Sequence, residues 1–152
     1  MPPTKGTTNT ASLFEERLAK NDLLPIGKEG KHLLVETSYF NPPMGLNNIL
    51  LRIKSKGYVP VLAHPERYVY MDESDYRQLK DLNVKFQLNL FSLTGAYGTG
   101  IKKKAGWLLK EGLYNLLGTD THNCRLYETM IPTAAIFNKQ LMTIKHMKSI
   151  LL

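Results

Sequence analysis

Short apolar runs of β-forming residues alternate along this chain with segments of helical periodicity, and this alternation limits its fold more than any other feature. The four apolar runs cover residues 33–35, 58–63, 84–88 and 113–117. Polar residues follow each run, and an amphipathic segment follows each of the first three. Strands that alternate with helices indicate βαβ units, whose strands are parallel and buried on both faces. The sequence therefore predicts an α/β protein with a parallel sheet.

The segments between the runs carry the spacing and the end signals of helices. Leu46, Ile49, Leu50 and Ile53 form one apolar stripe, and Gly57 follows as a C-terminal glycine. The remaining expected helices are one capped by Asp72 that carries Tyr76 and Leu79, one that carries Ile101, Ala105, Leu108 and Leu109 and stops at Gly112, and two terminal helices at 12–21 and 128–152.

Side chains able to carry chemistry stand at the carboxyl end of each expected strand. They are Glu36, His64, Asn89, Asp120 and His122. Parallel strands joined by helical crossovers bring their carboxyl ends to one rim of the sheet, where the active sites of α/β proteins lie. Because folding requires no charge at that rim, we expect these side chains to meet in a functional site.

Two carboxylates and two imidazoles at this rim form a metal-ligand set. Glu36, His64, Asp120 and His122 offer the mixed oxygen and nitrogen donors that suit Mn, Fe or Zn. A single histidine at a strand end is more often a hydrogen-bonded structural residue. Four ligand-type residues at corresponding strand ends instead favour a divalent metal site.

Two arginines follow the candidate histidines at the same short interval. Arg67 lies three residues after His64, and Arg125 lies three residues after His122. A guanidinium group binds phosphate as a bidentate fork, so two of them beside a metal indicate a phosphate or phosphoester ligand. The alternative for each is a surface arginine paired with Glu66 or Asp120. Both interpretations stay open from the sequence.

The charge of the chain favours anionic partners without selecting one. Twenty Lys and Arg against thirteen Asp and Glu give a net charge of +7. The basic residues are spread out, and the one basic run, at 102–104, cannot form a single stripe on a helix. A solvated helix face is the favoured interpretation, and a nucleic-acid contact is the alternative. The lack of aromatic residues interleaved with that run argues against nucleic acid.

The single cysteine bears on both compartment and mechanism. Cys124 excludes an internal disulfide and fits a reducing compartment. Arg125 is adjacent to it with no glycine-rich cradle between them, which argues against a cysteine phosphatase. No apolar stretch approaches the ~18 residues of a membrane helix, and residues 1–12 form a polar tail without a secretory leader. We therefore expect a cytoplasmic protein that does not insert into membranes.

Four segments together resemble a known family. LLVETSYFNPP, LAHPERY, QLNLFSLTGAYG and LLGTDTHN are similar to the bacterial PHP-type protein-tyrosine phosphatases of capsular and exopolysaccharide systems, which belong to the polymerase and histidinol phosphatase superfamily. The likeness runs from about Phe14 to the C-terminus. It implies a distorted TIM-like barrel with a cluster of divalent metals, usually manganese. It also implies hydrolysis of phosphotyrosine on the tyrosine autokinases that control polysaccharide export.

The resemblance also assigns roles to the residues at the rim. Glu36, His64, Asp120 and His122 match metal ligands of the family, while Arg67 and Arg125 match the residues expected to hold the phosphate. We also expect Asn89, at the same rim, to contact the substrate.

The chain departs from the family pattern at its start. The family opens with a His-x-His motif on its first strand, and this chain has no His before His32 and no His-x-His motif. Its four βα units also fall short of the ~250 residues of a complete barrel. The expected organisation is a disordered tail at 1–12 and a partial PHP barrel at 13–152, the C-terminal portion of such an enzyme. Open strand edges would then favour self-association or pairing with a missing N-terminal half.

Two further functions stay open from the sequence. One is a catalytically degenerate PHP fragment that binds a phosphorylated protein without turning it over. The other is a basic nucleic-acid-binding protein, which the charge permits and which salt-dependent DNA binding would reveal.

Overall fold

A computed structural model describes residues 16–17, 20, 23–120 and 148–149 of the chain. The expected polar tail at 1–12 lies outside these residues. Most of the expected terminal helices lies outside them as well, although Glu16 and Arg17 are helical. The prediction of a helix over 128–152 is wrong at Lys148 and Ser149, which form a strand instead. They pair with Leu116 and Leu117, so the sheet ladder takes up backbone groups that a helix would have bonded internally.

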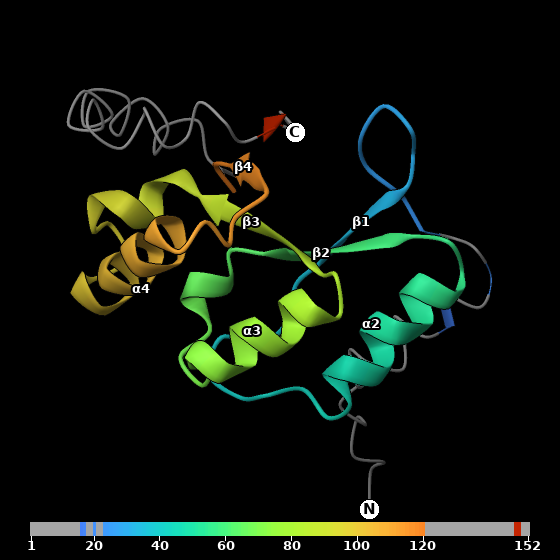
Figure 1. Ribbon diagram of the computed structural model, residues 1–152, viewed down its shortest axis with the longest axis horizontal. Helices are drawn as coiled ribbons and strands as arrows, with labels where there is room; N and C mark the ends of the chain where they lie inside the picture. The colour runs from blue at the N-terminus through green and yellow to red at the C-terminus, as the bar shows by residue number, and fades with distance from the viewer. Residues whose placement is uncertain (1–15, 18–19, 21–22, 121–147, 150–152) are drawn as a thin grey trace, which may run out of the picture.

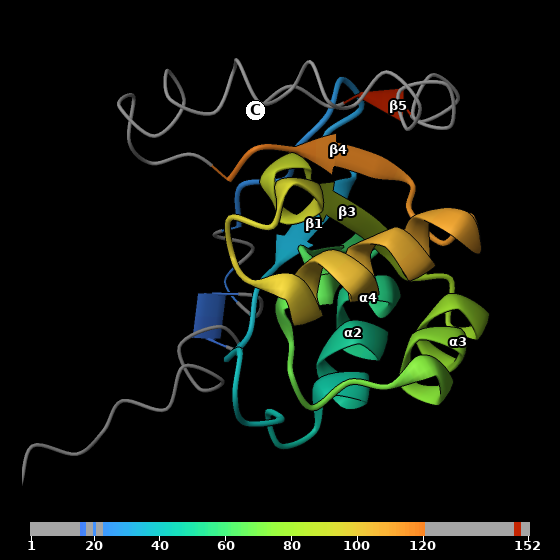
Figure 2. The same ribbon diagram turned by 90° about the vertical axis from the view of Figure 1, so that its left-hand side faces the viewer.

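Five parallel strands form one sheet, in the order in which they follow along the chain, β1-β2-β3-β4-β5 (Figure 1). The elements are β1 His32–Val35, α2 Leu46–Ser55, β2 Val59–Ala63, η1 Pro65–Arg67, α3 Glu73–Asp81, β3 Lys85–Asn89, η2 Leu90–Thr94, α4 Thr99–Lys110, β4 Leu116–Gly118 and β5 Lys148–Ser149. Sequential order arises when every crossover returns on the same side, and helices α2, α3 and α4 lie on one side of the sheet (Figures 1 and 2). The parallel α/β prediction is confirmed.

The core lies between the sheet and these three helices. Its buried side chains include Leu50 and Ile53 from α2, Tyr76 and Leu79 from α3, Ala105 and Leu108 from α4, and Leu62, Phe86 and Leu88 from the strands. Burial stabilises the fold by roughly 1.5–3 kcal/mol for each large apolar side chain. Most of the apolar helix positions expected from the sequence enter this core. Leu46 and Ile49 pack against it half-buried, and Ile101 does not belong to it.

Helix α3 begins as its sequence predicts. The Asp72 carboxylate accepts hydrogen bonds from the backbone N–H groups of Ser74 and Asp75, and Asp75 Oδ2 accepts one from Asp72 N–H at 2.9 Å. This reciprocal capping box satisfies N–H groups that the first helical turn cannot pair. It also fixes the point at which the chain leaves the rim after β2.

Strand β4 begins at Leu116, three residues later than the apolar run suggests. Leu113 N–H donates to Leu108 O and so belongs to the end of α4. Asn115 Oδ1 accepts from Phe86 N–H at 3.1 Å, which replaces a ladder bond with a side-chain contact. At the other end of β4, a Cβ on Gly118 would lie 2.5 Å from Nε2 of Gln87. A side chain at this position would require the Gln87 side chain to move.

The basic run on α4 is divided between solvent and the interior. Lys102 and Lys103 are exposed, as a solvated face predicts. Lys104 instead donates from Nζ to Tyr68 O at 2.7 Å and to Met71 O at 2.9 Å. It therefore ties α4 to the loop that follows η1. No helix in the described part of the chain combines the length and the apolar character needed to cross a bilayer.

Candidate metal and phosphate site

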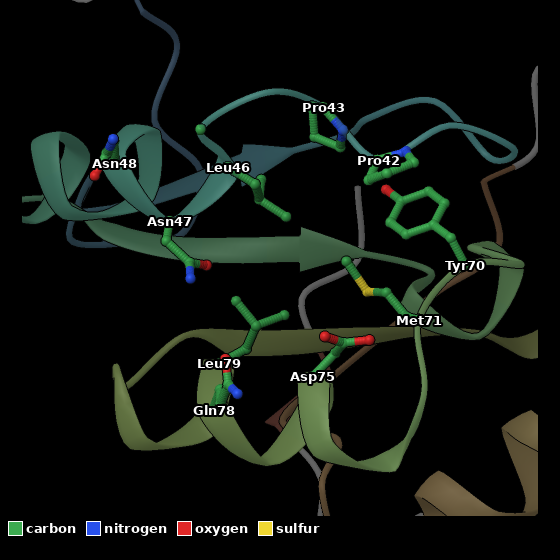
Figure 3. A pocket seen from close by; sticks show the side chains of 11 residues that line it. Pro42, Pro43, Leu46, Asn47, Asn48, Tyr70, Met71, Asp75, Gln78 and Leu79 are labelled. Carbon is green, nitrogen blue, oxygen red and sulfur yellow. The ribbon is translucent and has the colours of Figure 1, made fainter.

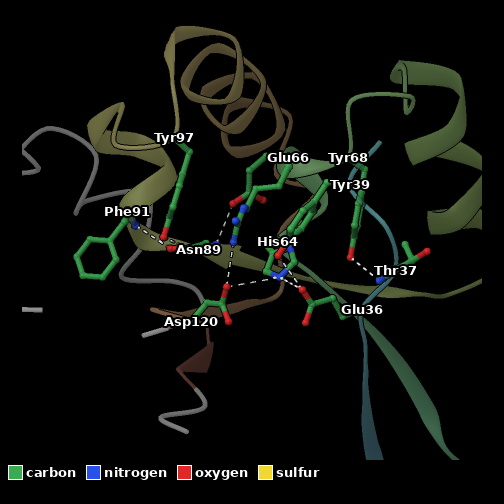
Figure 4. Close-up of polar contacts among 11 residues, drawn as sticks. Glu36, Thr37, Tyr39, His64, Glu66, Tyr68, Asn89, Phe91, Tyr97 and Asp120 are labelled. Atoms are coloured by element: carbon green, nitrogen blue, oxygen red, sulfur yellow. Dashed lines mark hydrogen bonds and ion pairs between the residues drawn. The ribbon is translucent and has the colours of Figure 1, made fainter. Parts of the chain in front are cut away.

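The carboxyl ends of four parallel strands bring the predicted polar residues together (Figure 4). Glu36 follows β1, His64 follows β2, Asn89 ends β3, and Asp120 lies two residues after β4. His64 Nε2 lies 3.3 Å from Glu36 Oε1 and 3.7 Å from Asp120 Oδ2. These distances place Glu36, His64 and Asp120 together at one rim, whereas the Asn89 side chain makes its described contacts with Tyr97 and Phe91.

His64 occupies the centre of this group. Its side chain is 2% exposed, and neither ring nitrogen makes a hydrogen bond to another described residue. The backbone has φ 31 and ψ 58, a left-handed conformation that a residue before proline ordinarily avoids. Such strain is held in place by the surrounding fold and is typical of functional positions.

The electrostatics of His64 favour a neutral imidazole. Burial lowers the pKa of His64, while the neighbouring Glu36 and Asp120 carboxylates act in the opposite direction. A neutral ring keeps a lone pair for a metal. Two donors held ~2.1 Å from one tetrahedral ion lie ~3.4 Å apart, close to the distances from Nε2 to the two carboxylates. Each of these two pairs of donors is therefore spaced as two ligands of one cation would be.

Arg67 lies against Asp120 and between two aromatic rings. Its Nη1 donates to Asp120 Oδ2 at 3.0 Å, and its Cζ lies 4.4 Å from the ring centres of both Tyr39 and Tyr97. The pairing with Asp120, considered above as an alternative to phosphate binding, is thus observed. It uses only one of the five N–H donors of the guanidinium group, so it leaves others for a phosphate.

Tyr39 contacts the candidate metal ligand as well as the arginine. Its hydroxyl donates to Glu36 Oε1 at 2.7 Å. Burial, together with this hydrogen bond to Glu36, raises the pKa of Tyr39 to about 12. The phenol therefore stays protonated near neutral pH and acts as a donor.

Comparison with known proteins places this arrangement in a family. Residues 10–152 match the family described as capsular polysaccharide synthesis, CpsB/CapC. This chain belongs to the CpsB/CapC family. The family resemblance inferred from its four sequence segments is confirmed.

Two CpsB/CapC relatives carry the name of tyrosine-protein phosphatase. The chain is 29% identical over 113 residues to YwqE of Bacillus subtilis (strain 168), which covers 73% of this chain and 44% of that protein. It is 30% identical over 119 residues to CpsB of Streptococcus pneumoniae, which covers 71% of this chain and 47% of that protein. The chain therefore spans less than half the length of these curated relatives.

The fold is shared with solved structures of the same family. The chain aligns with a TM-score of 0.64 and 23% identity to a chain from the crystal structures of YwqE from Bacillus subtilis and CpsB from Streptococcus pneumoniae, described there as unique metal-dependent tyrosine phosphatases. The alignment covers 90% of this chain and 61% of that one. This likeness supports the expected CpsB/CapC fold.

Some of the predicted site residues lie outside the part of the chain that the structure describes. His122 and Arg125 lie outside the described residues, as does Cys124. Within the described part of the chain, the metal-type contacts are pairwise through His64, and no three His, Cys, Asp or Glu side chains form a group that could hold an ion. The roles of Glu36, His64, Asp120 and His122 as metal ligands stay predictions.

The Asn89 side chain is buried and bonded within the protein, although the sequence predicts that it contacts the substrate. Its Oδ1 accepts from Phe91 N–H at 3.0 Å, which caps η2. Its Nδ2 donates to the hydroxyl of Tyr97 at 3.4 Å. The role of Asn89 toward substrate stays a prediction.

Glu66 is a site-adjacent residue that sequence reasoning did not identify. It is 1% exposed, its Oε1 accepts from Asn89 N–H at 3.0 Å, and its Oε2 accepts from the Tyr114 hydroxyl at 2.8 Å. Burial raises its pKa. From its place next to Arg67 in the sequence, Glu66 is expected only as a surface partner of that arginine. In the structure it is buried and binds the backbone N–H of Asn89 at the end of β3.

A separate pocket lies between the N-terminal parts of α2 and α3 (Figure 3). It has a volume of about 470 Å³, and its lining residues are Pro42, Pro43, Gly45, Leu46, Asn47, Asn48, Tyr70, Met71, Asp75, Gln78 and Leu79. None of these is a predicted site residue. The candidate site residues at the rim around His64 therefore lie outside this pocket.

Proposed function

We propose that this chain takes part in the metal-dependent hydrolysis of phosphotyrosine in proteins. The observation that carries the proposal is the placement of His64 Nε2 between the carboxylates of Glu36 and Asp120, with Arg67 bonded to the second of them. The names of the CpsB/CapC relatives support the reaction. The chain spans less than half the length of those relatives. Their activity therefore has to be tested on this chain directly.

The proposed cofactor is a divalent cation, with manganese first and iron or zinc as alternatives. Glu36, His64 and Asp120 would hold it, together with His122. Mixed carboxylate and imidazole donors suit these metals better than calcium or magnesium. When bound, a divalent cation supplies Lewis-acid activation of water and of phosphoryl oxygens.

The proposed task of Arg67 is to bind the phosphoryl group. Its guanidinium is held in place by Asp120 and by the two flanking rings, and its remaining N–H groups can pair with two phosphoryl oxygens at once. Arg125 is proposed as a second such group. Tyrosinate is a good leaving group because the pKa of its conjugate acid is about 10.

The proposed substrate is the phosphorylated tail of a bacterial tyrosine autokinase of polysaccharide export, encountered in the cytoplasm. The family description, capsular polysaccharide synthesis, supports this choice. We further propose that residues 13–152 act as part of a PHP domain, either as a homo-oligomer or with an N-terminal partner half.

The test is hydrolysis of an aryl phosphate and of a phosphotyrosine peptide by the full 152-residue chain. We expect phosphate release that Mn²⁺ stimulates and that EDTA abolishes, with a near-complete loss in His64→Ala. His32→Ala is the matched control, because His32 lies at the opposite end of β1 from the rim and should leave the rate unchanged. A rate that neither EDTA nor His64→Ala lowers would refute the proposal. Peptide binding without turnover would indicate the non-catalytic binding module instead.

A further inference from the structure

Tyr39, which is not among the predicted site residues, touches both halves of the candidate site. Its hydroxyl donates to Glu36 Oε1 at 2.7 Å, on the side of the metal-type donors. Its ring lies 4.4 Å from Cζ of Arg67, on the side of the phosphate-type donor. Figure 4 shows Tyr39 beside His64, near the Glu36 carboxylate.

The hydroxyl contact acts on a carboxylate that is otherwise loosely held. The Glu36 side chain is 53% exposed, so it would sample several rotamers in the absence of a partner. Tyr39 bonds the same oxygen, Oε1, that lies 3.3 Å from His64 Nε2. A hydrogen bond to one ligand oxygen fixes its direction, and loss of such a partner commonly weakens metal affinity by about 10- to 100-fold.

The ring contact acts on the arginine. Arg67 lies between the rings of Tyr39 and Tyr97, with 4.4 Å to each ring centre. The Tyr39 ring is itself anchored, because its backbone O accepts from Val69 N–H at 2.9 Å and its ring stacks on Tyr68 at 6.0 Å. A guanidinium held on both faces loses little conformational freedom when an anion binds to its edge.

We propose that Tyr39 is a positioning residue that orients Glu36 through its hydroxyl and Arg67 through its ring. The proposal rests on the proposed function only in treating Glu36 as a metal donor and Arg67 as a phosphate donor. The hydroxyl contact with Glu36 and the ring contact with Arg67 use different parts of the Tyr39 side chain, so substitutions can remove them separately.

The experiment measures the affinity of the full chain for Mn²⁺ and, separately, for inorganic phosphate. Mn²⁺ binding is followed by the electron paramagnetic resonance signal of the free ion, and inorganic phosphate binding is followed by calorimetry in EDTA. Tyr39→Phe should weaken Mn²⁺ binding about 10- to 100-fold and leave phosphate binding within about twofold of wild type. Tyr39→Leu should weaken both, with a loss of roughly 2- to 30-fold for phosphate. Tyr97→Leu, the matched control, should weaken phosphate binding alone.

Each outcome bears on the proposal. Wild-type Mn²⁺ affinity in Tyr39→Phe, or wild-type phosphate affinity in Tyr39→Leu, would overturn it, and so would a wild-type chain that binds no Mn²⁺. If Tyr39→Leu does not fold, Tyr39→Met removes the ring at similar volume and decides the second arm. A wild-type chain that binds both ligands but hydrolyses no phosphotyrosine would refute the proposed function, while the two affinities would still decide the role of Tyr39.

Discussion

Arg67 is the most constrained of the polar side chains at the rim. Asp120 holds one of its nitrogens at 3.0 Å, and two tyrosine rings cover its faces. Its side chain is 18% exposed, so part of it remains accessible to solvent. An anion that reaches the guanidinium group meets a donor whose direction is already set.

Removal of this donor should lower activity without a matching loss of stability. Arg67→Ala removes charge-assisted hydrogen bonds worth about 1.5–3 kcal/mol, so we expect kcat/KM for a phosphotyrosine peptide to fall roughly 10- to 150-fold. Arg77→Ala is the matched control, since Arg77 also pairs with a carboxylate, Glu111, but on exposed helix surface. The rate is measured with Mn²⁺ present and the urea midpoint is recorded alongside. Equal rates for the two variants would contradict a phosphate role for Arg67.

At the scale of the elements, the end of β4 determines where Asp120 stands. Gly118 pairs with Asn89 in the sheet and leaves no room for a side chain, because Gln87 fills the space beside it. Helix α4 is tied to the same region through Lys104, whose ammonium group binds two carbonyl oxygens of the loop after η1. Strand β4 and helix α4 thus help to fix the position of the rim, although none of the proposed ligands lies within either element.

A methyl group at Gly118 should destabilise the protein. A Cβ there would lie 2.5 Å from Gln87 Nε2 and 2.9 Å from Gln87 Cδ, so we expect Gly118→Ala to lower the free energy of unfolding by about 1–3 kcal/mol. In a Gln87→Ala background the same substitution should lower the free energy of unfolding much less. Urea unfolding of the wild type, the two single variants and the double variant measures this coupling.

The control for that cycle is Gly106→Ala. Gly106 lies inside α4 with open space around its Cα, so alanine there should stabilise the helix by about 0.5–1 kcal/mol. An unchanged midpoint for Gly118→Ala, or the same cost with and without Gln87, would show that the close approach of β4 and β3 carries no strain.

Sequence reasoning succeeds where local chemistry decides an element. Asp72 as the cap, with Tyr76 and Leu79 behind it, identifies α3 because capping and periodicity act within one helix. It misplaces the start of β4, because Asn115 satisfies the backbone of β3 through its side chain, a contact between distant segments. It misses Tyr39 and Glu66 for the same reason. Their roles arise from partners brought close only by the fold.

At the scale of the whole molecule, a half-buried lysine links α3 to the segment before β4. Lys80 Nζ donates to Asn115 Oδ1 at 2.6 Å and to Val84 O at 3.2 Å. Burial, with a smaller effect of the nearby Lys85 charge, lowers the pKa of Lys80 to about 8 from an ordinary value of 10.5. This half-buried ammonium group belongs to a chain that already has a net charge of +7.

This pKa shift predicts the direction of a pH dependence. Between about pH 8 and 10.5 the unfolded chain keeps a proton on Lys80 that the folded chain has released, so the free energy of unfolding should rise with pH in that interval. Lys80→Met should remove that contribution, as measured by urea unfolding at about pH 7.5 and about pH 9.5. Lys110→Met, an exposed position in α4, is the control. The same pH slope in wild type and Lys80→Met would contradict the assignment.

The left-handed backbones of His64 and Asp120, with φ of 31 and 48, set stability against chemistry at the same two positions. Glycine adopts such dihedral angles without steric conflict, whereas any residue with a β-carbon resists them. Folding alone would favour glycine at both, yet glycine brings no imidazole and no carboxylate. The imidazole of His64 and the carboxylate of Asp120 are therefore held against a backbone preference, and a sequence selected only for thermal stability would favour glycine at both positions.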